Sequence, residues 1–214
     1  MQFMHAHLYT DLFVVCGADA RCLVKNDSPL AGFAGTLVLT ALDVATGATH
    51  ALNSTAVALP AGAGAAAWLC AGAGSPRGGG GCAGWPALLA PLGLAPDTAV
   101  LQTALRDGAG ATVYSSFELL ATPAALLPAL PAAPRVDAAV GAPAPDGSSV
   151  PVTVSASGTA LFVTLTTAAH GRFSENFFIL AAGAQRVVDF LPFAALDVAT
   201  LKATLRVEHV RSYL

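Results

Sequence analysis

The stretch Val150-Pro-Val-Thr-Val-Ser155 decides the fold. Its valines alternate with proline, threonine and serine, which is the period of two expected for a strand with one apolar and one polar face. The same alternation recurs in Leu161-Phe-Val-Thr-Leu-Thr166, in Ala203-Thr-Leu-Arg-Val-Glu208 and, in the first half, at Leu37, Leu39 and Ala41. These rows predict half-buried antiparallel strands.

Turn-forming residues separate the strand-like stretches, at 26–29, 43–47, 145–147, 157–158 and 182–183. In the second half they recur at roughly the 8–12-residue spacing that is typical of a β-sandwich. Only residues 86–94 have a helical pattern, and strands do not alternate with helices along the chain. We therefore predict an all-β fold made of two consecutive antiparallel Ig-like β-sandwich domains.

A proline-rich run at 122–134 divides the chain. Its four prolines stiffen the backbone and oppose regular pairing. We predict a first domain at 1–132, with a mobile Gly-rich loop at 71–84, and a second domain at 133–214.

Composition narrows the classes of function. Of 214 residues, 55% are hydrophobic and 11% are charged, so the chain can bury a core and is not a disordered protein. A net charge of -3, with lysines and arginines scattered singly, argues against nucleic acid as a partner. The sequence has no uninterrupted apolar run of about 18 residues, so we expect no membrane span. The first residues lack the pattern of a signal peptide.

The cysteines and histidines offer little support for a metal site or any cofactor. Cys16 and Cys22 are either buried strand residues or a disulfide, and Cys70 and Cys82 bracket the Gly-rich loop, where a disulfide would form in an oxidising compartment. The pair His5-Ala-His7 has no third ligand near it, so we interpret it as incidental.

Two glycosylation sequons are present, at Asn26 and Asn53. If used, they indicate a secretory or lysosomal route; if they are only turn residues, a cytoplasmic protein remains the alternative. We expect Trp68 and Trp85 to be core residues rather than a sugar-binding platform, because tryptophan is usually buried.

The segment Gly171-Arg-Phe-Ser-Glu-Asn-Phe-Phe-Ile-Leu180 resembles the closing segment of the β-mannosidases of glycoside hydrolase family 2. That family has Asp where Glu175 stands and a small residue where Phe177 stands. The strand at 185–190 and the end at 205–213 are similar to the family's last hairpin and closing strand. The segment 11–47 is similar, more loosely, to its penultimate sandwich domain.

The resemblance implies a parent enzyme that removes terminal non-reducing β-D-mannose with retention, through two glutamates in a catalytic barrel. A retaining site needs two carboxylates about 5–5.5 Å apart. This chain has only Glu118, Glu175 and Glu208, in contexts that do not match the barrel motif. We therefore expect no catalytic, cofactor-binding or metal-binding residues, and a chain that is inactive alone.

The implied role is to support the barrel of the parent enzyme, which is the expected partner. Two alternatives remain: a free-standing module whose partner is carbohydrate or another protein, and a parent of the exo-β-glucosaminidase type. We interpret Gly171 to Asn176 as a structural corner, in which Gly171 allows a tight turn and the polar side chains bond to backbone groups.

Overall fold

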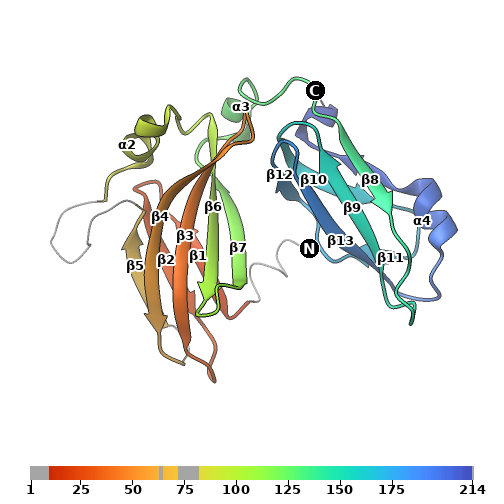
Figure 1. Ribbon diagram of the computed structural model, residues 1–214, viewed down its shortest axis with the longest axis horizontal. Coiled ribbons are helices and arrows are strands. Elements are labelled where there is room, and N and C mark those ends of the chain that lie inside the picture. Colours follow the sequence, from red (N-terminus) through yellow and green to blue (C-terminus); the bar gives the residue numbers. More distant parts are fainter. Residues whose placement is uncertain (1–9, 63–64, 72–81, 214) are drawn as a thin grey trace. The chain divides into compact units, whose positions relative to one another are not determined.

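The computed structural model describes residues 10–62, 65–71 and 82–213, apart from the side chain of Trp68. The chain folds as two compact units (Figure 1). The first comprises His7–Val44 and Ala48–Ala129, and the second includes Leu130–Leu214. The junction at 129–130 falls inside the proline-rich run, where α3 (Pro123–Leu126) forms a short helix whose first turn is capped by Thr122.

The first unit contains two antiparallel sheets. One has the order β1-β2-β5 and the other the order β4-β3-β6-β7. The strands are β1 (Leu12–Cys16), β2 (Arg21–Asn26), β3 (Phe33–Asp43), β4 (Thr49–Leu59), β5 (Ala65–Cys70), β6 (Ala99–Asp107) and β7 (Thr112–Leu119). The strands β1 and β7 each end their own sheet, so the two open edges are available for contacts between sheets.

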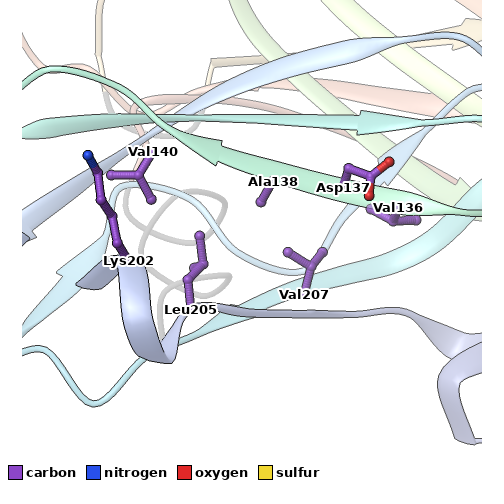
Figure 2. Close-up of a pocket in the computed structure, with 7 residues that line it drawn as sticks. All are labelled: Val136, Asp137, Ala138, Val140, Lys202, Leu205 and Val207. Carbon is purple, nitrogen blue, oxygen red and sulfur yellow. The ribbon is translucent and has the colours of Figure 1, made fainter. Parts of the chain in front are cut away.

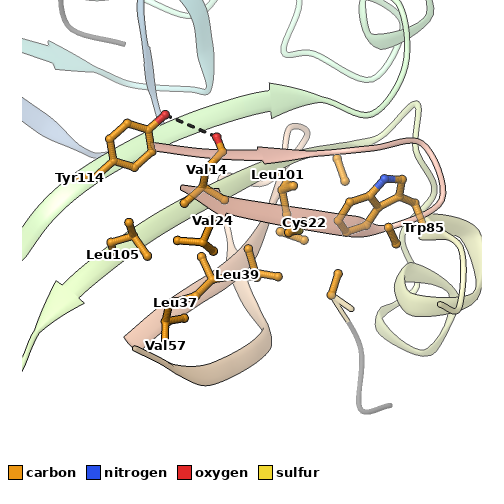
Figure 3. Packing of buried hydrophobic residues seen from close by; sticks show 14 of the residues in the cluster. Val14, Cys22, Val24, Leu37, Leu39, Val57, Trp85, Leu101, Leu105 and Tyr114 are labelled. Atoms are coloured by element: carbon orange, nitrogen blue, oxygen red, sulfur yellow. Dashed lines mark hydrogen bonds between the residues drawn. The ribbon is translucent and has the colours of Figure 1, made fainter. Parts of the chain in front are cut away.

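The core of the first unit lies between these sheets (Figure 3). The alternating residues Leu37, Leu39 and Ala41 of β3 are all at most 1% exposed, as the sequence pattern predicts. Cys22 and Val24 of β2 pack against them from the facing sheet. The period of two along each strand therefore produces a single apolar layer.

A short helix covers one end of this core. Residues expected to be helical at 86–94 form α2 (Trp85–Leu89) followed by the 3₁₀ turn Ala90–Leu92. Trp85 is 4% exposed, and its Nε1 donates a hydrogen bond of 2.9 Å to the Gly17 carbonyl. The prediction that Trp85 is a core residue is confirmed, and the hydrogen bond satisfies the one polar atom that the ring buries.

The second unit is also a sandwich of two antiparallel sheets, with strand orders β11-β13-β9-β8 and β12-β10-β14. Its strands are β8 (Val136–Val140), β9 (Val150–Ala156), β10 (Ala160–Thr166), β11 (Gly171–Phe173), β12 (Phe178–Leu180), β13 (Gln185–Pro192) and β14 (Arg206–Glu208). Val150, Val152 and Val154 are each 0% exposed in the core, as their alternation predicts.

The expected strand at 203–208 is only half right. The helix α4 (Val198–Thr204) takes the first residues, and β14 begins at Arg206. Asp197 caps α4 by accepting a hydrogen bond from the Thr200 amide at 2.9 Å. This cap starts a helix with buried Leu201 on its inner side, so the alternation from Ala203 extends into the last turn of the helix. The last described element is the 3₁₀ turn Val210–Tyr213. Of the helices described here, none is both long and apolar enough to cross a membrane.

All four cysteines are paired, in the disulfides Cys16–Cys22 and Cys70–Cys82. The first joins directly opposite residues of β1 and β2. Of the two readings of Cys16 and Cys22, the structure therefore shows the disulfide.

The sequon at Asn26 is built into the fold. Asn26 is 1% exposed, and its Nδ2 donates hydrogen bonds to the Ala31 and Pro60 carbonyls at 2.9 and 3.1 Å. A glycan on this nitrogen is incompatible with that geometry. Asn53 is half-buried in β4, and its Nδ2 lies 3.4 Å from the Cys70 carbonyl.

Candidate functional site

The three glutamates are the first residues to place, because retaining glycoside hydrolysis requires a pair of carboxylates. Glu118 lies on β7, where its Oε1 accepts a hydrogen bond of 2.8 Å from the Cys16 amide of β1. Burial raises the pKa of the Glu118 carboxyl, and the Cys16 hydrogen bond opposes this shift. On the same side of β7, the Tyr114 hydroxyl donates to the Val14 carbonyl at 3.5 Å (Figure 3).

These two contacts join the open edges of the sheets in the first unit. Val14 and Cys16 are two residues apart on β1, and Tyr114 and Glu118 are four apart on β7, so each pair shares one side of its strand. The side chains of Tyr114 and Glu118 satisfy backbone groups of β1 that have no other strand beside them among the described residues. Glu118 therefore has a structural role.

The other two glutamates are held by different groups. Glu175 forms an ion pair of 2.7 Å with Arg186, whose guanidinium also lies 5.1 Å from the centre of the Phe178 ring. Glu208 accepts a hydrogen bond of 2.8 Å from the Tyr213 hydroxyl. This bond raises the pKa of Tyr213. Each glutamate of the chain is thus engaged by a cation, a hydroxyl or an amide.

The segment Gly171 to Asn176 carries the chain from one sheet of the second unit to the other, from β11 to β12. Ser174 bonds twice to Asp189 of β13: its amide donates to the Asp189 carbonyl at 2.6 Å, and its hydroxyl accepts from the Asp189 amide at 3.0 Å. These contacts hold the crossing chain against the strand that it leaves.

Asn176 acts as a substitute for a strand. Its Oδ1 accepts from the Leu165 amide at 2.7 Å, and its Nδ2 donates to the Leu165 carbonyl at 2.9 Å. A backbone neighbour would make the same donor and acceptor pair in an antiparallel ladder. The next residue, Phe177, has a left-handed backbone (φ 65°) and donates its amide to the Val163 carbonyl at 2.9 Å. Ser174 and Asn176 therefore bond to the backbone, as expected for a corner, whereas Glu175 pairs with the Arg186 side chain instead.

Glycine is required at position 171 for a different reason from the tight turn that we expected. It lies in β11, opposite Pro192, and not in a tight turn. A Cβ at this position would stand 2.6 Å from the Leu191 carbonyl and would also strike the ring of Phe190. The glycine is therefore required by a close approach of two strands, and the sequence alone could not distinguish this from a turn.

Exposed aromatic rings, which a sugar-binding face would need, have internal partners. Phe177 is 44% exposed and stacks on Phe162, with ring centres 4.6 Å apart. Phe193 meets the edge of His170 at 5.4 Å, and Tyr213 is bonded to Glu208. The three exposed rings come from separate segments of the second unit.

The second unit also contains a groove, and the described residues contain no cluster of metal-ligand side chains. Among residues 10–62, 65–71 and 82–213, no group of three or more histidines, cysteines, aspartates or glutamates could hold a metal ion. His5 and His7 lie outside the described residues. A groove of about 400 Å³ opens beside β8 in the second unit (Figure 2). It is lined by Val136, Asp137, Ala138, Val140, Lys202, Leu205 and Val207. Sequence reasoning did not anticipate it, because its walls come from segments about 60 residues apart that only the sandwich topology brings together.

One known sequence family matches the second unit of the chain. Residues 133–213 match the sequence family Ig_mannosidase, an Ig-fold domain. No curated protein matches the chain.

Solved structures share the fold over nearly the whole chain. The β-D-mannosidase of Dictyoglomus thermophilum matches 94% of this chain with a TM-score of 0.63 and 16% identity, and 22% of that protein is covered. The exo-chitosanase of Amycolatopsis orientalis matches 93% of this chain with a TM-score of 0.54 and 16% identity, and 25% of that protein is covered. The chain therefore spans about a quarter of the length of these enzymes or less. Residues 133–213 thus match an Ig-fold domain family, Ig_mannosidase, and the likeness to these enzymes over the rest of the chain is one of fold.

Proposed function

We propose that this chain is the non-catalytic C-terminal β-sandwich region of a β-mannosidase and that it supports and docks against the catalytic barrel of that enzyme. The parent enzyme would hydrolyse terminal non-reducing β-D-mannose in glycan degradation. The observation that carries the proposal is the match of residues 133–213 to an Ig-fold domain of mannosidases. The similarity of nearly the whole chain to a part of a β-D-mannosidase supports it.

The chemistry of the side chains agrees with a supporting role. Glu118, Glu175 and Glu208 are each used in contacts that hold strands or turns together. In the crossing segment, Asn176 uses both its amide oxygen and its amide nitrogen to bond to the backbone of Leu165. The carboxylates and the amide that could contact a substrate instead make hydrogen bonds and ion pairs within the chain.

A parent of the exo-β-glucosaminidase type is the second candidate. The similarity to the exo-chitosanase of Amycolatopsis orientalis favours it, with nearly the same coverage of this chain. The two parents differ in the barrel, where the substrate would bind, so accessory domains of either would have the architecture seen here.

We also propose a secretory or lysosomal location. Disulfides persist mainly in oxidising compartments, and this chain has two. Asn53 is the remaining candidate for a glycan, because the amide of Asn26 is buried in hydrogen bonds.

Two measurements test the proposal. Purified 1–214 should not turn over 4-nitrophenyl β-D-mannoside; turnover that disappears in Glu118→Gln, Glu175→Gln or Glu208→Gln would overturn the non-catalytic assignment. The reading frame upstream of the Met1 codon should encode a catalytic barrel. When that barrel is expressed as a separate polypeptide, it should become soluble and active only with 1–214 present. A barrel that is equally active without it would refute the supporting role.

A further inference from the structure

Among the strands that the structure describes, none pairs with the outer side of β8. It ends the sheet β11-β13-β9-β8, so β9 is its one neighbour within that sheet. The Gly141 amide donates to the Pro151 carbonyl at 2.8 Å, and the Arg135 carbonyl accepts from the Ser157 amide at 2.9 Å. Backbone groups alternate in direction along an antiparallel strand. Those of Val136, Ala138 and Val140 therefore face away from β9.

The same three residues also form one wall of the groove (Figure 2). Their half-buried side chains stand over Leu205 and Val207, which come from the end of α4 and from β14. The open backbone and the groove thus lie on the same side of the domain. An extended chain can use both at once, because its backbone pairs with β8 while alternate side chains enter the groove.

The two charged side chains that line the groove, Asp137 and Lys202, differ in their ion pairing. Asp137 is already paired with Arg135, whose Nε lies 2.8 Å from its Oδ2. Lys202, in the last turn of α4, stands at the Val140 end of the groove and belongs to none of the ion pairs found among the described residues. The Val140 end is therefore positive and suits a carboxylate.

A second copy of β8 does not fit this pattern. If two copies paired antiparallel about Ala138, Pro134 of one would fall opposite Ala142 of the other, beyond Val140. In this register Asp137 of the second copy falls opposite Ala139, so the strand itself offers no carboxylate beyond Val140. An extended peptide of a different sequence can place a carboxylate there.

We infer that β8 is a strand-addition site for an extended acidic peptide. The peptide pairs antiparallel with β8, places apolar side chains opposite Val136, Ala138 and Val140, and directs an acidic side chain at Lys202. This inference does not depend on the parent enzyme.

The probe is a fluorescently labelled peptide, acetyl-Glu-Thr-Val-Thr-Val-Thr-Val-Thr-amide, titrated with full-length 1–214 and followed by anisotropy. In the antiparallel register its valines face the groove and its glutamate lies beyond Val140. Exchanging this glutamate for lysine should weaken binding about 3–10-fold, the range for a partly exposed ion pair replaced by a repulsion. Lys202→Glu should reverse the preference between the two peptides.

The decisive variant is Ala138→Pro. It removes an outward-facing donor but no bond to β9, and edge strands tolerate proline at such positions. It should weaken the peptide at least about tenfold. If it unfolds, Ala138→Asp, which places a charge in the groove, substitutes for it. Ala139→Thr, on the opposite face of β8, is the matched control and should bind as the wild type does.

Three outcomes would overturn the inference. They are no binding at millimolar protein, equal binding to Ala138→Pro and to wild type, and no response to exchanging the charge at Lys202. Sedimentation that shows a dimer dissociated by Ala138→Pro would instead assign the edge to a second copy of the chain.

Discussion

Replacement of Asn176 by alanine tests how the second unit is held together. The change removes one acceptor and one donor from the Leu165 backbone, and Leu165 is only 1% exposed. Each buried backbone group left without a partner costs about 1–3 kcal/mol. Two such groups give an expected loss of about 2–6 kcal/mol, and for a domain of this size a fall in Tm of about 8 °C or more.

The chain offers a convenient way to assign the effect to one unit. Its two tryptophans, Trp68 and Trp85, are both in the first unit. Far-ultraviolet circular dichroism reports both units, whereas tryptophan fluorescence reports the first. Asn176→Ala should shift the dichroism transition of the second unit and expose the Leu165 amide to rapid hydrogen exchange.

Two further variants sharpen the test. Asn176→Asp keeps the shape but points a carboxylate oxygen at the Leu165 carbonyl, so it should also destabilise the unit at neutral pH and recover partly in acid. Gln185→Ala changes an exposed side chain of β13 and should leave the transition where it is. If Asn176→Ala leaves both the transition and the exchange of Leu165 unchanged, the segment is not a structural corner.

Three other substitutions should change stability in defined directions. Phe178→Ala empties a site that is 2% exposed and should cost the second unit about 3–5 kcal/mol in a urea titration; a loss below about 1 kcal/mol would contradict its place in the core. Burial raises the pKa of Glu118 above its ordinary 4.5, so its contribution to stability is largest in acid and falls as the pH rises through the folded value. Glu118→Gln should therefore flatten the pH dependence of the fluorescence midpoint. Burial lowers the pKa of His209 below its ordinary 6.5, so the second unit should lose stability as the pH falls through that range. His209→Gln should remove this loss, and a wild-type dichroism midpoint that is equal at about pH 5 and pH 7.5 would contradict the argument.

Stability depends on pH in opposite directions at Glu118 and at His209, because burial acts on groups of opposite charge. Protonation of Glu118 removes a charge that burial disfavours. Burial disfavours the charged ring of His209, and its buried Nδ1 has no hydrogen-bond partner among the described residues, whereas a backbone hydrogen bond to Pro134 partly offsets the lowered pKa. The two units should therefore have different pH optima of stability.

The sequence predicts those parts of the fold that depend on local pattern. The alternation of Val150, Val152 and Val154 identifies a buried strand face because strand geometry alone requires it. The same rule fails at Ala203, where the cap at Asp197 starts a helix that ends inside the alternating stretch. The alternation from Ala203 favours a strand and the cap at Asp197 favours a helix, and the sequence does not show which of the two signals prevails.

The contacts that define the candidate site depend on distant partners. Glu118 meets Cys16 across 102 residues, and Asn176 meets Leu165 across 11. Both partners are fixed by strand register and by which sheet edges face each other, and neither is encoded in local composition. The corner residues could be recognised as polar turn formers, but the substitution of an amide side chain for a strand could not.

The disulfide Cys70–Cys82 has a consequence for how the chain comes apart. A protease that cuts anywhere between these cysteines leaves the two pieces covalently joined, whereas a cut in the proline-rich run 122–134 releases the second unit at once. On a non-reducing gel the first kind of cut would be invisible, and the mass would stay that of the intact chain. Adding a thiol would reveal it as fragments separating near residue 75. The order in which the two regions are cleaved can therefore be read only by comparing reduced and unreduced samples of the same digest.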